Sequence, residues 1–79
     1  MENVKWISTE QLIENLLNEP DNDQEYRRHI GGILFSTHWF VYDSKRGQFG
    51  DSTDFFEYEW FTQEELLDCY AGARWHRDA

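Results

Sequence analysis

The sequence predicts an α+β fold, in which an antiparallel sheet of about three strands carries an N-terminal and a C-terminal helix on one face. Two amphipathic segments with helix-start signals, one near each end of the chain, indicate the helices. The stretch between them is rich in aromatic and β-branched residues, which favour strands. A chain of 79 residues has room for one domain, so residues 1–79 are expected to form a single compact unit.

The first helix is predicted from about Thr9 to Glu19. Ser8 is a suitable N-cap residue and Gln11 follows it three residues later, as in a capping box, while Pro20 ends the segment. The apolar side chains recur at helical spacing and share one stripe, which consists of Leu12, Ile13, Leu16 and Leu17. This helix therefore has one face that can cover a core.

Residues 23–30 fit two structures. In the first, Asp23 caps a short helix that ends at Gly31, with acidic residues early and basic residues late, as the helix dipole favours. In the second, Tyr26 to Ile30 form a strand that turns at the Gly-Gly pair after it. We expect the helix, and the strand is the alternative.

Two strands follow this segment. They are expected in ILFSTHWFVYD and in DFFEYEWF, because both stretches are rich in strand-forming residues. The SKRG stretch between them suits a turn, with Gly47 at the position that needs a left-handed backbone. The two strands are therefore expected to pair as antiparallel neighbours.

The second helix is predicted to begin after Thr62. Glu65 completes a capping box with Thr62, and Phe61 and Leu66 are placed to form a hydrophobic staple. Its buried stripe is expected to contain Leu67, Tyr70 and Ala71. The W-F-T-x-E-E-L-L junction resembles the one near the end of Nudix hydrolases, but the chain lacks the Glu-rich catalytic box of that family, so the resemblance concerns helix capping.

The strand that begins near Asp54 is expected to have two faces of different character. Period-two alternation puts three aromatic residues on the predicted core face, namely Phe56, Tyr58 and Trp60. The outer face carries two rings and two carboxylates, which belong to Phe55, Phe61, Glu57 and Glu59. The two carboxylates would be about 6.6 Å apart. Large rings beside charged groups are typical of protein interfaces, although the same rings fit the core of a three-layer domain or a homodimer.

Charge narrows the choice of partner. The chain has 16 acidic and 7 basic residues and a net charge of -9, which disfavours direct binding of DNA, RNA or an anionic membrane and favours a basic partner. From Gln48 to Tyr70 there are seven acidic residues and no basic one. The seven are Asp51, Asp54, Glu57, Glu59, Glu64, Glu65 and Asp68.

In size, acidity and aromatic content the chain resembles small phage-encoded inhibitors of host defence, namely anti-CRISPR proteins and DNA-mimicking antirestriction proteins. The resemblance implies a non-enzymatic protein without a cofactor, which occludes a basic nucleic-acid-binding surface of a bacterial defence or nucleic-acid-processing complex. The seven carboxylates would meet Lys and Arg of the partner, with Phe55 and Phe61 as neighbouring apolar contacts. Such a protein would be a monomer or a homodimer. The alternative class is a homodimerising or adaptor module without nucleic-acid mimicry.

A catalytic hypothesis comes third. The dipeptides His38-Trp39, Asp51-Ser52 and Asp68-Cys69 resemble the His, Asp, Cys order of the SUMO-protease and adenovirus-protease group. That resemblance would make His38, Asp51 and Cys69 catalytic. However, Cys69 follows the Thr62 cap by about two turns, away from the helix N-terminus at which such a thiolate is activated, and we expect it to be buried. The spacing of the His and Cys residues predicts no metal site.

The cellular setting is expected to be the cytoplasm. Cys69 is the single cysteine, so no internal disulfide can form, which fits a reducing compartment. The opening MENVKWISTE lacks the basic flank and apolar run of a signal peptide, and the longest apolar stretch, Trp39 to Tyr42, is too short to cross a bilayer. We therefore expect no membrane contact.

Overall fold

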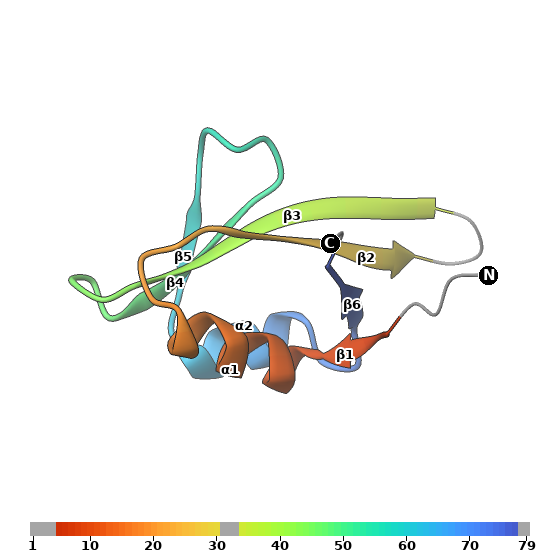
Figure 1. Ribbon diagram of the computed structural model, residues 1–79, viewed down its shortest axis with the longest axis horizontal. Coiled ribbons are helices and arrows are strands. Elements are labelled where there is room, and N and C mark those ends of the chain that lie inside the picture. Colours follow the sequence, from red (N-terminus) through yellow and green to blue (C-terminus); the bar gives the residue numbers. More distant parts are fainter. Residues whose placement is uncertain (1–4, 31–33, 78–79) are drawn as a thin grey trace.

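The computed structural model describes residues 5–30 and 34–77. Across these residues it contains a six-stranded antiparallel sheet and two short helices (Figure 1). The α+β class is as predicted, but the expectation of about three strands is wrong. In the sheet the strands follow the order β1-β6-β2-β3-β4-β5. In chain order the elements are β1 (Ile7–Ser8), α1 (Thr9–Asn18), β2 (Gln24–Ile30), β3 (Leu34–Asp43), β4 (Gln48–Ser52), β5 (Glu59–Phe61), α2 (Gln63–Cys69) and β6 (Arg74–His76).

The first helix, α1, begins where the sequence predicts. Ser8 Oγ accepts a hydrogen bond from the Gln11 amide at 3.1 Å, which satisfies one of the free N–H groups of the first turn. Three of the four residues in the predicted apolar stripe are buried, whereas Leu17 is 43% exposed. The buried stripe of α1 is therefore narrower than the spacing of the apolar residues suggested.

Residues 24–30 form a strand, so the expected helix from Asp23 is wrong. β2 pairs with β3 along its whole length, with Tyr26 opposite His38 and Arg28 opposite Ser36, and it also pairs with β6. Tyr26 is fully buried, and this long-range packing outweighs the local charge order that favoured a helix. The predicted turn residues Gly31 and Gly32 lie outside the described residues.

Three strands outside the predicted ones account for the rest of the difference in strand number. β1 and β6 have 2 and 3 residues, too few for a period-two pattern to be recognised. β4 follows the turn at Gly47 and pairs with β3, so the expected direct pairing of β3 with the strand from Asp54 is wrong. Within that predicted strand only β5 forms, and it pairs with β4. Contacts between distant parts of the chain place β1 and β6. The indole Nε1 of Trp75 donates to Thr9 Oγ1 at 3.0 Å, and Thr9 Oγ1 donates to the Tyr70 carbonyl at 2.9 Å. These bonds join the two ends of the described chain.

The second helix and the turn have the predicted local structure. The Glu65 amide donates to Thr62 Oγ1 at 3.1 Å and the Thr62 amide donates to Glu65 Oε1 at 2.9 Å, so the capping box is complete. Gly47 has a φ of 68°, the left-handed value that the turn requires. Ala71, expected on the buried stripe, is exposed, because α2 ends at Cys69 and the chain turns toward β6.

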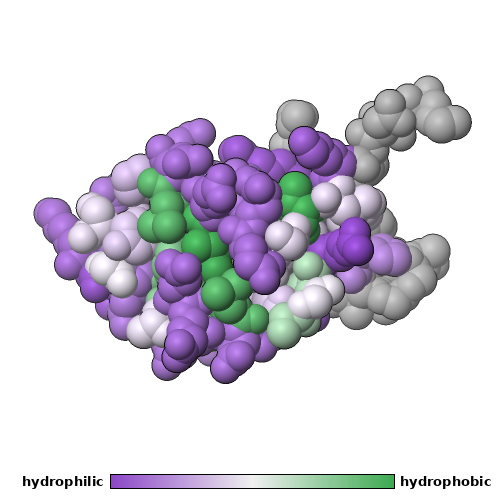
Figure 2. Space-filling model, turned by 90° about the horizontal axis from the view of Figure 1, so that it is seen from below, coloured by the Kyte–Doolittle hydropathy of each residue, from purple (hydrophilic) through white to green (hydrophobic). Residues whose placement is uncertain are grey.

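Both helices lie on one face of the sheet, which we call the helix face (Figure 1). The core lies between the helices and this face and consists of Leu12, Ile13, Leu16, Tyr26, Phe40, Phe49, Leu66, Tyr70 and Trp75. Seen from the helix side, the surface is mostly hydrophilic, with a narrow hydrophobic band across it (Figure 2). Neither helix in the described residues has the length and apolar character that spanning a bilayer requires.

The opposite face of the sheet, the open face, is covered by aromatic rings. The rings of Tyr58 and Trp60 stack with their centroids 5.8 Å apart, and the Arg46 guanidinium lies 4.1 Å from the centre of the Trp60 ring. The ring of Trp39 packs against that of Phe55, with their centroids 5.4 Å apart. The excess of aromatic residues in the sequence is thus partly used to cover this face in place of a helix.

Candidate functional site

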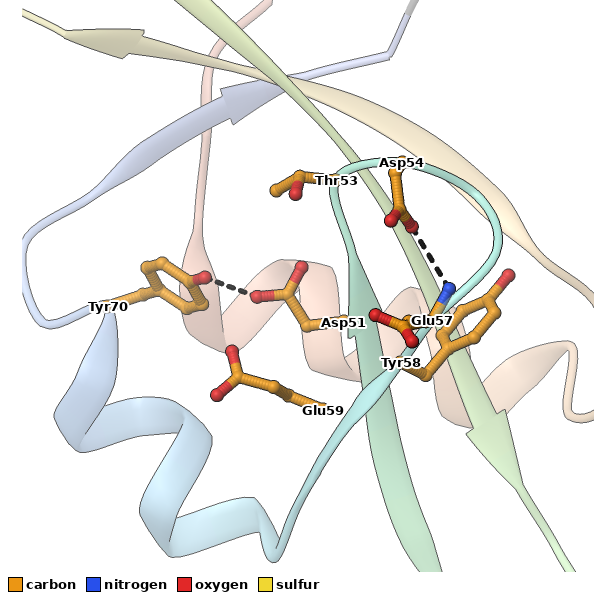
Figure 3. A pocket seen from close by; sticks show the side chains of 7 residues that line it. All are labelled: Asp51, Thr53, Asp54, Glu57, Tyr58, Glu59 and Tyr70. Carbon is orange, nitrogen blue, oxygen red and sulfur yellow. Dashed lines mark hydrogen bonds between the residues drawn. The ribbon is translucent and has the colours of Figure 1, made fainter.

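An open pocket of about 560 Å³ lies between the end of α2 and the loop of residues 53–58, which joins β4 to β5. Its lining residues are Asp51, Thr53, Asp54, Glu57, Tyr58, Glu59 and Tyr70. Figure 3 shows the side chains of Asp51, Glu57 and Glu59 between Tyr70 and this loop. The lining contains four carboxylates and no Lys or Arg, so the pocket is suited to a cationic group.

Asp54 holds the 53–58 loop in shape. Its Oδ1 accepts hydrogen bonds from the amides of Glu57 at 3.0 Å and Phe56 at 2.9 Å and from Ser52 Oγ at 3.1 Å. The two backbone bonds, that from Glu57 first, lower the pKa of Asp54, so this carboxylate stays charged at neutral pH. The loop presents Phe55 in a left-handed conformation, with φ 67°, and leaves Phe56 86% exposed.

The Asp51 carboxylate is part of a buried hydrogen-bond network. Its side chain accepts hydrogen bonds from His38 Nδ1 at 2.9 Å and from the Tyr70 hydroxyl, and the Asp51 residue is 5% exposed. Burial, and then the bond to Asp51, raise the pKa of Tyr70, which keeps this hydroxyl protonated as a donor. Asp51 thus forms a wall of the pocket whose oxygens already have partners.

Glu57 and Glu59 differ from the other two carboxylates. Both residues are exposed, and neither side chain makes a hydrogen bond or ion pair with any residue in the described ranges 5–30 and 34–77. Asp51 and Asp54 therefore shape the pocket, while Glu57 and Glu59 supply the carboxylates that can receive an incoming cation.

The expected division of faces around these glutamates is wrong. β5 pairs with β4 so that Glu59 lies opposite Asp51 and Phe61 opposite Phe49, which puts Glu59 and Phe61 on the helix face. Trp60, expected in the core, lies on the open face over Gly50. The reason is that β5 begins only at Glu59, so the alternation counted from Asp54 does not apply to the preceding loop.

The remaining predicted binding residues lie outside the pocket lining. Phe55 is 51% exposed on the loop, and Phe61 packs against the core. Glu65 uses its carboxylate in the capping box, and Glu64 and Asp68 are exposed on α2. The structure therefore brings together four of the nine predicted site residues: Asp51, Asp54, Glu57 and Glu59.

Three lining residues were not predicted. Thr53 and Tyr58 come from the loop, and Tyr70 reaches the pocket from the end of α2. Tyr58 donates to Asp23 Oδ2 at 3.1 Å. Burial, and then this bond, raise the pKa of Tyr58 to about 12. An alternating count along the chain could not find these residues, because the pocket depends on the turn between β4 and β5.

The catalytic hypothesis named three residues. His38 and Asp51 are in contact, whereas Cys69 is on the surface and was expected to be buried. His38 and Asp51 are hydrogen bonded and buried. Cys69 is exposed at the last position of α2, so the expectation that it is buried is wrong. Among the residues that the structure describes, no cluster of three or more His, Cys, Asp or Glu side chains is placed to hold a metal ion.

Comparison with known proteins gives no relatives. No protein-family model, curated protein or solved structure matches this chain. The functional proposal therefore rests on the geometry and charge of the chain itself.

Proposed function

We propose that this protein acts in the bacterial cytoplasm as an inhibitor that binds another protein and occludes its basic nucleic-acid-binding surface, and that this inhibition involves no chemical step. The observation that carries the proposal is the pocket in which four carboxylates gather without a Lys or Arg in the lining. Nucleic-acid-binding proteins present clusters of Lys and Arg that are arranged to receive closely spaced phosphate charges. A fixed group of carboxylates competes for the same side chains.

The two unpaired glutamates supply a moderate electrostatic contribution. Exposed ion pairs contribute about 0.2–1 kcal/mol each, so Glu57 and Glu59 together would contribute about 0.4–2 kcal/mol, or roughly 2- to 30-fold in Kd. The net charge of -9 adds long-range attraction to a basic partner and opposes the approach of a second copy of the chain.

An apolar anchor stands beside the pocket. Phe56 is 86% exposed and lies on the loop that Asp54 and Ser52 hold in shape, with the Phe55 amide donating to Ser52 Oγ at 2.9 Å. Burying one such ring contributes about 1.5–3 kcal/mol. A loop already held in its bound shape avoids most of the ordering cost of binding. We therefore expect the partner to offer an apolar depression next to its basic residues.

The proposal is tested by capture of proteins from a bacterial lysate that have first been selected for binding to DNA-cellulose. The immobilised wild-type chain should retain one or a few of these proteins and should release them as salt rises. The double variant Glu57→Gln/Glu59→Gln should lose most of this retention.

The matched control is Glu10→Gln/Glu14→Gln, which removes the same number of charges from exposed positions of α1 outside the pocket. It should retain the same proteins as the wild type. Equal retention by all three chains would exclude the pocket as the binding site. Equal loss in both variants would show that retention depends on the net charge of the chain and not on the pocket. Retention that salt does not weaken would instead favour an apolar adaptor contact.

A further inference from the structure

A second group of polar side chains forms a hydrogen-bonded chain on the helix face of the sheet. Ser36 Oγ lies 3.0 Å from His38 Nε2, and His38 Nδ1 lies 2.9 Å from Asp51 Oδ1. The Tyr70 hydroxyl donates to the other oxygen of Asp51. A serine, a base and a carboxylate that orients the base therefore follow one another, and this arrangement defines an activated nucleophile by its geometry.

The proton positions follow from the hydrogen-bond partners. Asp51 as a carboxylate only accepts, so His38 Nδ1 carries the proton that is donated to it. A neutral imidazole protonated at Nδ1 has a free lone pair on Nε2, which is the atom that faces Ser36 Oγ. The Ser36 hydroxyl then donates to His38, as a serine nucleophile does to its base.

Aromatic packing holds the His38 imidazole in place, while Ser36, at one end of the hydrogen-bonded chain, lies closer to the surface. The His38 ring stacks on Phe40 with centroids 5.6 Å apart and meets the edges of Tyr70 and Trp75 at 5.7 and 5.1 Å. His38 is 6% exposed and Asp51 is 5% exposed, whereas Ser36 is half-buried. The base and its orienting carboxylate are thus shielded from water, and the nucleophile is the accessible member.

A cation stands next to the serine. Arg28 lies directly opposite Ser36 in the β2–β3 pair, so the two side chains project from the same face about 5 Å apart at Cβ. The Arg28 guanidinium lies over the rings of Tyr70 and Trp75, 5.2 and 6.0 Å from their centres. A guanidinium in this position can stabilise negative charge that develops on an oxygen beside Ser36.

We propose that Ser36 is a nucleophile that accepts an acyl group from a carboxylic ester, with His38 as general base and Asp51 and Tyr70 as positioning residues. Ser36 Oγ forms the bond to the carbonyl carbon while its proton passes to His38 Nε2. The ester C–O bond then breaks, and the proton moves from His38 to the departing alkoxide, which leaves as an alcohol. Water then attacks the acyl carbon while His38 Nε2 takes its proton. The bond between Ser36 Oγ and the acyl carbon breaks, His38 returns the proton to Ser36 Oγ, and the acid leaves. This activity goes beyond the proposed binding function and does not depend on it.

The test uses a fluorophosphonate, with which an activated serine forms a Ser–O–P bond and releases fluoride. The folded wild-type chain should acquire one adduct, and peptide mapping should place it on Ser36. General-base assistance is typically worth at least about 100-fold, so labelling should be about 100-fold faster than in the same chain unfolded in urea. The exposed-serine variant Ser44→Ala should label at the wild-type rate, whereas Ser36→Ala should not label.

Peptide mapping of the labelled wild-type chain tests whether Ser36 is the nucleophile even if a variant fails to fold. No adduct on the folded chain, or an adduct spread over several serines, would overturn the proposal. The variant His38→Gln, with folding checked by its circular dichroism, separates a base from a structural neighbour. It should label at least about tenfold more slowly. An unchanged rate would remove His38 from the role assigned to it.

Discussion

Replacing Asp51 separates the role of its charge from that of its hydrogen bonds. In Asp51→Asn the amide oxygen can still accept from the Tyr70 hydroxyl, while the amide NH₂ donates to His38 Nδ1. The imidazole must then carry its proton on Nε2 and donate to Ser36 Oγ. Every buried group keeps a partner, but the proton order along the chain is reversed.

The cost of this change follows from the number of bonds. A hydrogen bond to a charged group contributes about 1.5–3 kcal/mol and a neutral one about 0.5–1.5 kcal/mol, so each bond that loses its charge should cost about 1–1.5 kcal/mol and the two together about 2–3 kcal/mol. Asp51→Leu, of similar size, leaves the His38 N–H and the Tyr70 hydroxyl buried without an acceptor. At about 1–3 kcal/mol for each unsatisfied group, it should cost about 2–6 kcal/mol.

Urea unfolding followed by tryptophan fluorescence measures both values. The signal is suitable because Trp75 is fully buried and its ring lies 5.1 Å from that of His38. Asp51→Asn should also lose most of the fluorophosphonate labelling at Ser36, because the reversed tautomer no longer accepts the serine proton. An Asp51→Leu variant whose free energy of unfolding lies within about 1 kcal/mol of the wild type would refute this reasoning about buried partners. Wild-type labelling in Asp51→Asn would refute the assigned proton order.

Two further predictions concern the open face and its tyrosine. A Cβ at position 50 would lie 2.9 Å from Trp60 Cζ3 and 3.0 Å from Tyr58 Cδ2, so Gly50→Ala should lower the free energy of unfolding by about 1–3 kcal/mol. In a Trp60→Val background the same change should cost less, because only the contact with Tyr58 remains, and an equal cost would show that the Trp60 ring is not the obstacle. The pKa of Tyr58 is raised from 10.0 to about 12, so its proton contributes stability that is fully present below pH 10 and is lost as pH rises through about 12. Tyr58→Phe should therefore reduce the fall of the urea midpoint between pH 10 and 12, and an unchanged fall would show that another group causes it.

The helix starts and the main turn were predictable because their signals are local. Ser8, Thr62 with Glu65, and Gly47 each act within a few residues of their own position, and the structure contains all three arrangements. Charge order near Arg28 is also a local signal, but there it was outweighed. The alternative strand from Tyr26 to Ile30 is the one that the structure contains. The choice between helix and strand depends on β3 and β6, which lie on the two sides of β2, and β6 is distant from β2 in the sequence.

The acidic site was predictable in part. The run of carboxylates without cations identified Asp51, Asp54, Glu57 and Glu59, which do share a pocket. Which way they face was not predictable, since the loop before β5 interrupts the alternation of the strand. The division between structural and unpaired carboxylates was equally hidden, because it depends on the distant partners His38 and Tyr70.

The decisive measurement is a competition for the partner between this protein and duplex DNA at constant ionic strength. If the acidic pocket occupies the nucleic-acid-binding surface, increasing concentrations of duplex DNA should displace the captured partner completely, and the partner should not bind both at once. A stable ternary complex of this protein, its partner and DNA would contradict the proposed occlusion.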